Sequence, residues 1–265
     1  MKIKIAVWLC LLICVGFSAA DAQTPVKNDA FARGEVLRYE AKLSRALVGG
    51  MSLGGADLTF TVASAPNGKD YLFLTEVVSK GNLLKLFRQR FSQKYESTVD
   101  GDKFHILKTI KHDEQNERVR DSEAIFDYGS KQVTYTEINP EDKARAPRRI
   151  ASPIREDTLD LVSGIYNLRR LPLAVGKTFE LSISDSGLVY RIPVRVTGRE
   201  LQNSVLGKVW CFRVEPQVFG ANRLIEDDGK MILWITEDSR RIPVRAEIFA
   251  SVGKVDIKLK KPTSK

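Results

Sequence analysis

Alternation of apolar and polar residues with a period of two dominates most of the chain. Residues 58–62 place Leu, Phe and Val between threonines, and residues 254–260 place Val, Ile and Leu between charged residues. Such alternation predicts strands with one buried face. The runs at 71–78, 209–214 and 231–235 are apolar on both faces, which is typical of strands buried from two sides. The pattern predicts about a dozen strands, mostly joined to their sequence neighbours as in an antiparallel meander.

Turn-forming residues separate these runs where hairpins need them. The clearest pairs are Asn67-Gly68, Asp100-Gly101, Tyr128-Gly129, Ser186-Gly187 and Asp228-Gly229. Two glycine pairs, Gly49-Gly50 and Gly54-Gly55, stand in a strand context without a following helix. They therefore favour β-bulges or strong curvature over a phosphate-binding loop.

One segment departs from the strand pattern and predicts a helix over residues 157–171. Asp157 can cap it, with Asp160 as the acidic residue of the first turn. Apolar residues then recur at helical spacing, Arg169 and Arg170 suit the C-terminal dipole, and Pro172 ends the run. A single helix in such a chain is best placed across the apolar face of a sheet or in the end of a barrel.

These elements predict a mainly β protein, a strongly curved antiparallel sheet or open β-barrel with one central helix (157–171). The alternative is a two-sheet β-sandwich. Residues 31–260 are expected to form one β-rich domain after a disordered lead-in at residues 23–33.

The first 22 residues have the three parts of a cleavable secretory signal peptide. Lys2 and Lys4 give the positive start, residues 5–17 the apolar stretch, and Ala20-Asp21-Ala22 the small residues at the cleavage site. We therefore expect a periplasmic or secreted protein, with no transmembrane anchor once the signal is cleaved.

Removal of residues 1–22 leaves Cys211 as the sole cysteine, which excludes an internal disulfide and, in its apolar run, indicates a buried thiol. The shortened chain has 40 basic against 32 acidic residues, a net charge of +8. Because these charges are scattered, they argue against a nucleic-acid partner. The oligomeric state stays open.

Catalytic residues are hard to find in the sequence. His105 and His112 are an odd number of positions apart, which on one strand places them on opposite faces. We expect neither a metal nor a cofactor, and no catalytic residue is assigned. Carboxylates cluster at 156–160 and 226–228, so an envelope hydrolase with a carboxylate pair is the alternative. A helix cap and a turn explain both clusters equally well.

The segment 82–90 interleaves large apolar residues with bases directly after a Gly-Asn turn. This composition is typical of a loop at a cavity mouth that touches an amphiphile or membrane headgroups. The competing interpretation is that Leu84 and Phe87 enter the core while the bases face water. The ligand-binding candidates are Leu83, Leu84, Leu86, Phe87, Arg88 and Arg90.

Several phrases in a fixed order carry a resemblance to a known family. They lie at residues 33–39, 157–169, 173–176, 198–200 and 229–244. Together they resemble the exported bacterial proteins of domain-of-unknown-function family 3108, over residues 31–260. The resemblance implies a periplasmic or secreted β-rich protein and transfers no catalytic residues.

The recurring residues in these phrases are interpreted as structural. Trp234 is a large core anchor. Asp238 and Arg241 can bridge the ends of a tight hairpin, and Pro243 can protect a sheet edge. Tyr166, within the helical phrase, belongs with them.

The sequence therefore favours a non-enzymatic binding or scaffold protein of the cell envelope, with a lipid or other amphiphile as the possible partner. The alternatives are the carboxylate hydrolase and a protein-assembly role without a ligand.

Overall fold

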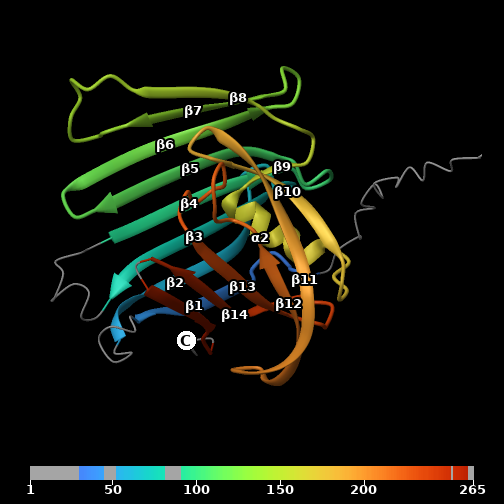
Figure 1. The fold of residues 1–265 in the computed structure, drawn as a ribbon. Coiled ribbons are helices and arrows are strands. Elements are labelled where there is room, and N and C mark those ends of the chain that lie inside the picture. The colour runs from blue at the N-terminus through green and yellow to red at the C-terminus, as the bar shows by residue number, and fades with distance from the viewer. Residues whose placement is uncertain (1–29, 45–51, 81–90, 252, 262–265) are drawn as a thin grey trace, which may run out of the picture.

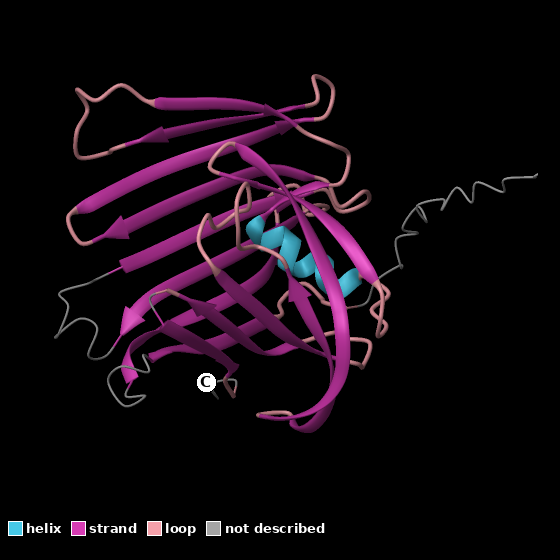
Figure 2. Cartoon of the chain, in the orientation of Figure 1, coloured by secondary structure: helices cyan, strands magenta, loops and turns pink. Residues whose placement is uncertain are grey.

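The computed structural model describes residues 30–44, 52–80, 91–251 and 253–261. In this part of the chain, one sheet of 15 strands curls around a helix, α2 (Leu161–Arg170) (Figures 1 and 2). The strand order is β8-β7-β6-β5-β4-β3-β2-β1-β15-β14-β13-β12-β11-β10-β9. The predicted curved sheet with a central helix is confirmed. The two-sheet sandwich is wrong, because all the described strands belong to one hydrogen-bonded order.

The sheet consists of two meanders joined through the pairing of β1 with β15. The first comprises β1 (Val36–Ser44), β2 (Ser52–Ser64), β3 (Tyr71–Lys80), β4 (Phe91–Val99), β5 (Ile106–Gln115), β6 (Arg118–Asp127), β7 (Gln132–Ile138) and β8 (Arg148–Pro153). The second comprises β9 (Thr158–Asp160), β10 (Thr178–Asp185), β11 (Leu188–Ser204), β12 (Gly207–Pro216), β13 (Gly229–Thr236), β14 (Pro243–Ala250) and β15 (Gly253–Leu259). All neighbours are antiparallel except β9 and β10, which are parallel.

The two sheet edges, β8 and β9, do not pair, and a hairpin tip lies across the gap. The turn between β10 and β11 reaches β7 and β8, where the Ser152 hydroxyl donates to the Gly187 carbonyl at 2.6 Å. Gly187 has a φ of 82°, and a Cβ there would lie 2.7 Å from Cβ of Tyr135 and 2.8 Å from Cβ of Ile150. Only glycine satisfies both the backbone conformation and this close approach.

A bulge where β1 meets β2 contributes to the curvature. The register passes from Leu43 opposite Gly54 to Ser44 opposite Ser52. A Cβ on Gly55 would stand 2.1 Å from the Ala41 carbonyl oxygen. The bulge expected near Gly54-Gly55 is therefore present, and Gly55 allows the two strands to approach.

Helix α2 begins four residues later than the sequence predicted. Its N-cap is Asp160, whose carboxylate accepts from the Ser163 amide at 2.7 Å, while the Ser163 hydroxyl accepts from the Asp160 amide at 3.1 Å. The assignment of Asp157 as the cap is wrong, because residues 158–160 pair with β10 as β9 and leave Asp157 outside. None of the described helices is long and apolar enough to cross a membrane.

The main core lies between α2 and the inner face of the sheet. The Tyr166 ring stacks on Phe73, with centroids 4.0 Å apart, and Phe31 meets both rings edge-on. Ala30 and Phe31 are therefore core residues, which corrects the expected lead-in at its C-terminal end. Residues 32 and 33 are exposed, and residues 23–29 and the signal sequence lie outside the described residues.

A second cluster contains Trp234 and Cys211, both buried as expected. The Trp234 indole donates to a carboxylate oxygen of Glu200 at 2.7 Å. Burial raises the pKa of the Cys211 thiol to about 11, so the thiol is protonated at neutral pH.

The hairpin between β13 and β14 differs from the expectation in two details. The Arg241 amide donates to the Asp238 carbonyl at 3.1 Å, so these two residues do meet across the turn, but through their backbones. The Asp238 carboxylate accepts from Arg240 at 2.7 Å and from the Thr236 hydroxyl, whereas the Arg241 guanidinium lies over the Phe212 ring. Pro243 does not protect an edge, because β14 lies between β13 and β15. It is tolerated as the first residue of its strand, at a register shift.

Candidate functional site

An apolar cavity of about 140 Å³ lies between α2 and the strands β1, β2, β13, β14 and β15. Most of its lining residues are apolar or aromatic: Leu37, Tyr39, Leu58, Phe60, Ile165, Tyr166, Met231, Leu233, Pro243, Ala246 and Ile257, with Arg169 and Arg245 besides. A dry cavity of this size accepts a molecule such as benzene. It therefore has room for a short stretch of hydrocarbon.

The strand register explains why most of the strand residues in this lining share one face. Tyr39 is opposite Leu58, and Leu233, Ala246 and Ile257 are opposite one another across β13, β14 and β15. Residues directly opposite in a sheet point to the same side. Helix α2 covers this face and places Ile165, Tyr166 and Arg169 against it.

Arg169 lines the cavity and is almost completely buried. Its guanidinium donates to both carboxylate oxygens of Glu35, at 2.5 and 2.9 Å, and to the carbonyl oxygens of Ala30 and Arg240. The Glu35 charge thus balances the Arg169 charge. The hydrogen bonds of the Arg169 guanidinium join the helix to the N-terminal segment and to the β13–β14 turn.

Tyr166 lies beside this ion pair and is only 2% exposed. Its hydroxyl has no hydrogen-bond partner among the described residues. Burial, followed by the charge of Glu35, raises the pKa of Tyr166 well above its usual value, so the hydroxyl keeps its proton. Tyr166 is therefore a lining residue whose buried hydroxyl stays protonated and unpaired among the described residues.

The second arginine of the lining, Arg245, is also paired. It donates to Asp256 at 2.9 Å and to Glu247 at 2.5 Å, and it lies over the Trp234 ring. Both cations that line the cavity thus face carboxylates, and the lining offers no uncompensated positive charge.

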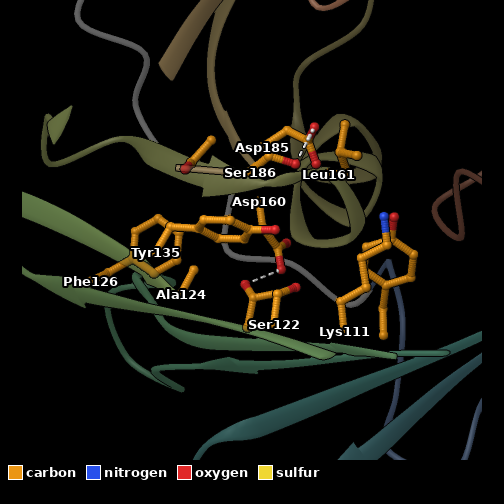
Figure 3. A pocket seen from close by; sticks show the side chains of 12 residues that line it. Lys111, Ser122, Ala124, Phe126, Tyr135, Asp160, Leu161, Asp185 and Ser186 are labelled. Atoms are coloured by element: carbon orange, nitrogen blue, oxygen red, sulfur yellow. Dashed lines mark hydrogen bonds between the residues drawn. The ribbon is translucent and has the colours of Figure 1, made fainter. Parts of the chain in front are cut away.

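A separate polar pocket of about 30 Å³ lies at the start of α2 (Figure 3). Asp160 points from the helix start toward the strands that carry Lys111 and Ser122. Its carboxylate accepts from the hydroxyls of Ser97 and Thr109, besides the Ser163 amide. A pocket this small holds about two water molecules.

Lys111 and Asp185 bring opposite charges to the same pocket. Burial lowers the pKa of Lys111, but the Tyr95 hydroxyl and the carboxylates of Asp113 and Asp185 outweigh it, and the net shift is upward. Lys111 is therefore a cation at neutral pH, and the pocket is a satisfied polar cluster around the helix cap.

The other carboxylates singled out in the sequence lie apart from this cap. Glu156 pairs with His105 at 3.4 Å and Asp157 with Arg155 at 2.9 Å, at the rim of an open depression of about 450 Å³. Residues 226–228 are exposed. His105 stacks on Tyr128, and His112 pairs with Asp121 and Glu114. Across the described ranges, no group of three His, Cys, Asp or Glu side chains is placed to hold a metal ion.

The six ligand-binding candidates, Leu83, Leu84, Leu86, Phe87, Arg88 and Arg90, lie outside the described residues, and their role stays a prediction. The cavity itself uses residues that the sequence pattern assigned to strands and helix. Tyr166 was interpreted as structural, and nothing local to its sequence signals that its hydroxyl would be unpaired.

Comparison with known proteins supports the fold and gives no activity. The chain has a TM-score of 0.56 and 10% identity to the solved structure of a beta-barrel-like protein of domain of unknown function DUF1849 from Brucella abortus, covering 85% of this chain and 95% of that one. A hypothetical protein, CT021 from Chlamydia trachomatis, aligns over 90% and 91% of the two chains, with 9% identity and a TM-score of 0.35. No curated protein matches. The model of the family described as "Protein of unknown function (DUF3108)" matches residues 38–260, and the chain belongs to that family.

Proposed function

We propose that this protein is a non-enzymatic protein of the cell envelope that binds the apolar part of a lipid or other amphiphile. The observation that carries the proposal is the cavity between α2 and strands β1, β2 and β13–β15. An apolar concave site with few polar groups is the usual form of a small-molecule site. The signal-like residues 1–22 support the envelope as the location.

The partial burial of residues on the inner face of the sheet supports a ligand cavity over a core that the protein's own side chains fill. Leu37, Leu58, Phe60, Met231 and Leu233 all line the cavity and are only partly buried. Burying such residues is worth about 25 cal/mol per Å² of apolar surface removed from water. A hydrocarbon chain laid against them gains that free energy.

The experiment uses two tryptophan substitutions of exposed isoleucines. Ile165→Trp, on α2, puts a large ring into the cavity, and Ile125→Trp, on β6, serves as the control outside it. Each full-length chain is exported from a bacterium and purified without detergent, and bound lipid is extracted and quantified by mass spectrometry. Leu233→Phe is a second filling variant if Ile165→Trp does not fold.

We expect lipid with the wild type and Ile125→Trp, and several-fold less with either filling variant. Lipid at the level of an unrelated exported protein, or equal lipid in folded filled and control variants, would contradict the proposal.

A further inference from the structure

The hairpin of β11 and β12 extends beyond the sheet as a two-stranded ribbon (Figure 1). Among the described strands, β10 pairs with β11 only as far as Arg195, and β13 pairs with β12 only from Cys211 onward. Residues 198–210, which we call the distal ribbon, therefore have register partners only within the hairpin. Such a ribbon has two faces and a tip that no neighbouring strand flanks.

One face of the distal ribbon packs on the protein and the other does not. Val205 and Val209 lie against the second core cluster. Leu201 and Trp210 are opposite each other in the register, so they share the other face, where they are 49% and 46% exposed. Leu206, at the tip, is 37% exposed. The distal ribbon thus presents three large apolar side chains to solvent.

The turn at the tip has an unusual composition. A two-residue hairpin turn normally carries Asn, Asp or Gly. The turn between Ser204 and Gly207 carries Val205 and Leu206 instead. Its backbone is supported by the left-handed Gly207 and by the Ser204 hydroxyl, which accepts from the Leu206 amide at 3.0 Å. Neither support requires an exposed apolar side chain at the tip, whereas an apolar partner would use one.

The charges on the distal ribbon favour an anionic partner. Its acid, Glu200, pairs with Arg213 at 3.2 Å, and Arg199 pairs with Glu237 at 2.8 Å. Lys208 is exposed near the tip and takes part in none of the ion pairs found among the described residues. The whole chain has a net charge of +9, so the long-range field adds to the local excess of positive charge.

The size of this apolar surface separates a bilayer from a protein partner. A stable protein interface takes roughly 20–30 residues a side, far more than the three exposed side chains of the distal ribbon. A lipid bilayer needs only a few apolar side chains to enter its interface, together with electrostatic attraction to anionic lipid. Tryptophan is enriched at the membrane–water interface, and lysine is drawn to anionic headgroups.

We infer that the distal ribbon docks on an anionic lipid bilayer. The side chains of Leu201, Leu206 and Trp210 enter the headgroup region, and Lys208 faces the lipid phosphates. This inference goes beyond the proposed function, because none of these four residues lines the cavity beneath α2.

The test uses the full chain, exported and purified without detergent, with vesicles of equal parts phosphatidylglycerol and phosphatidylethanolamine. Phosphatidylcholine vesicles serve as the neutral comparison. The chain has three tryptophans, and a Trp8→Phe background leaves Trp210 and Trp234, of which Trp234 is 5% exposed. Lipids with bromine on their acyl chains quench a tryptophan only at close contact, so they report whether the Trp210 ring enters the bilayer.

Flotation of the vesicles measures the binding of each variant. Trp210→Ser and Leu201→Ser should each weaken binding to anionic vesicles by about tenfold, because each removes apolar surface that the bilayer buries. Lys208→Gln should weaken it by about fivefold and leave the neutral vesicles unaffected. The matched controls are Ile125→Ser, at a position on β6 with 49% exposure, and Lys143→Gln, at an exposed position in the loop before β8. Both controls should stay within about twofold of the wild type, because they lie away from the docked surface.

Brominated anionic lipid should quench the wild type, and Trp210→Ser should remove that quenching; circular dichroism verifies that each variant is folded. No binding to anionic vesicles, quenching that Trp210→Ser leaves in place, or ribbon variants that bind like the controls would overturn the inference. A wild type that self-associates in light scattering without binding vesicles, and that Trp210→Ser dissociates, would assign the ribbon to a second copy and overturn it too. Lipid held in the cavity is measured separately, so each of these results leaves the proposed function standing.

Discussion

Arg169 on α2 donates to both carboxylate oxygens of Glu35, a residue 134 positions earlier in the chain, at 2.5 and 2.9 Å. This contact anchors the helix to the segment that enters β1. Because the Arg169 side chain is 1% exposed, Glu35 supplies the opposite charge that offsets the cost of burying the guanidinium.

Breaking this pair should destabilise the protein strongly. We expect Arg169→Met and Glu35→Gln each to lower the free energy of unfolding by roughly 3–5 kcal/mol, measured by urea denaturation. The double variant should cost less than the two single variants together, because the pair couples them. Arg155→Met, which removes exposed ion pairs with Asp157 and Glu180, should cost about 1 kcal/mol or less. An Arg169 variant that matches this control would refute the anchoring role.

The capping role of Asp160 gives a second prediction. Asp160→Ala removes the helix cap and the acceptor of the Ser97 and Thr109 hydroxyls, so we expect a loss of roughly 2–4 kcal/mol in the free energy of unfolding. Asp157→Ala, at the exposed position that the sequence favoured as the cap, should change it by less than about 0.5 kcal/mol. Thermal and urea unfolding compare the two, and the reverse ranking would show that the helix begins at Asp157.

The hairpin tip at Gly187 should be intolerant of any side chain. Gly187→Ala forces a Cβ into Tyr135 and Ile150 at a positive φ, whereas Gly176 has a similar φ of 87° and nothing within 4 Å of its Cβ position. Both substitutions incur a backbone penalty of about 1–2 kcal/mol. Gly187→Ala should add about 1–3 kcal/mol of overpacking and speed hydrogen exchange in β7 and β8. Equal stability losses in the two variants would mean that the tip of the β10–β11 hairpin does not pack tightly against β7 and β8.

His112 should make stability depend on pH in a defined direction. Its hydrogen bonds to Glu114 and then Asp121 raise its pKa in the folded protein above the ordinary value of 6.5. The protonated form is thus favoured by folding, and its contribution is complete below pH 6.5 and lost as pH rises through the folded pKa. The stability difference between wild type and His112→Gln should therefore shrink as pH rises above 6.5. A difference that grows over that window would have the wrong sign.

The strands were accessible from the sequence because alternation with a period of two is a direct consequence of one-sided burial. The start of α2 was not accessible from the sequence, because Asp157 and Asp160 are both good caps. The choice between these two residues depends on a tertiary contact. Parallel pairing with β10 draws residues 158–160 into the sheet and leaves Asp160 to cap.

The cavity was not predictable for a related reason. Leu58 and Ile257 carry the same alternating signal as filled core positions, and Leu233 lies in a run that is apolar on both faces. Only the register of distant strands and the position of α2 leave space between them. The unpaired hydroxyl of Tyr166 depends likewise on which residues surround it after folding.

The central claim is that the apolar part of a lipid or other amphiphile occupies the cavity beneath α2, and photolabelling tests it most directly. A neutral acyl ester with a diazirine on its chain is bound to the full-length protein and irradiated, and the labelled residues are identified by mass spectrometry. The account predicts labels at cavity residues such as Leu58, Ile165 and Leu233, reduced by excess unlabelled ester. Labels confined to exposed outer residues such as Ile125 and Trp210, or unaffected by competitor, would contradict it.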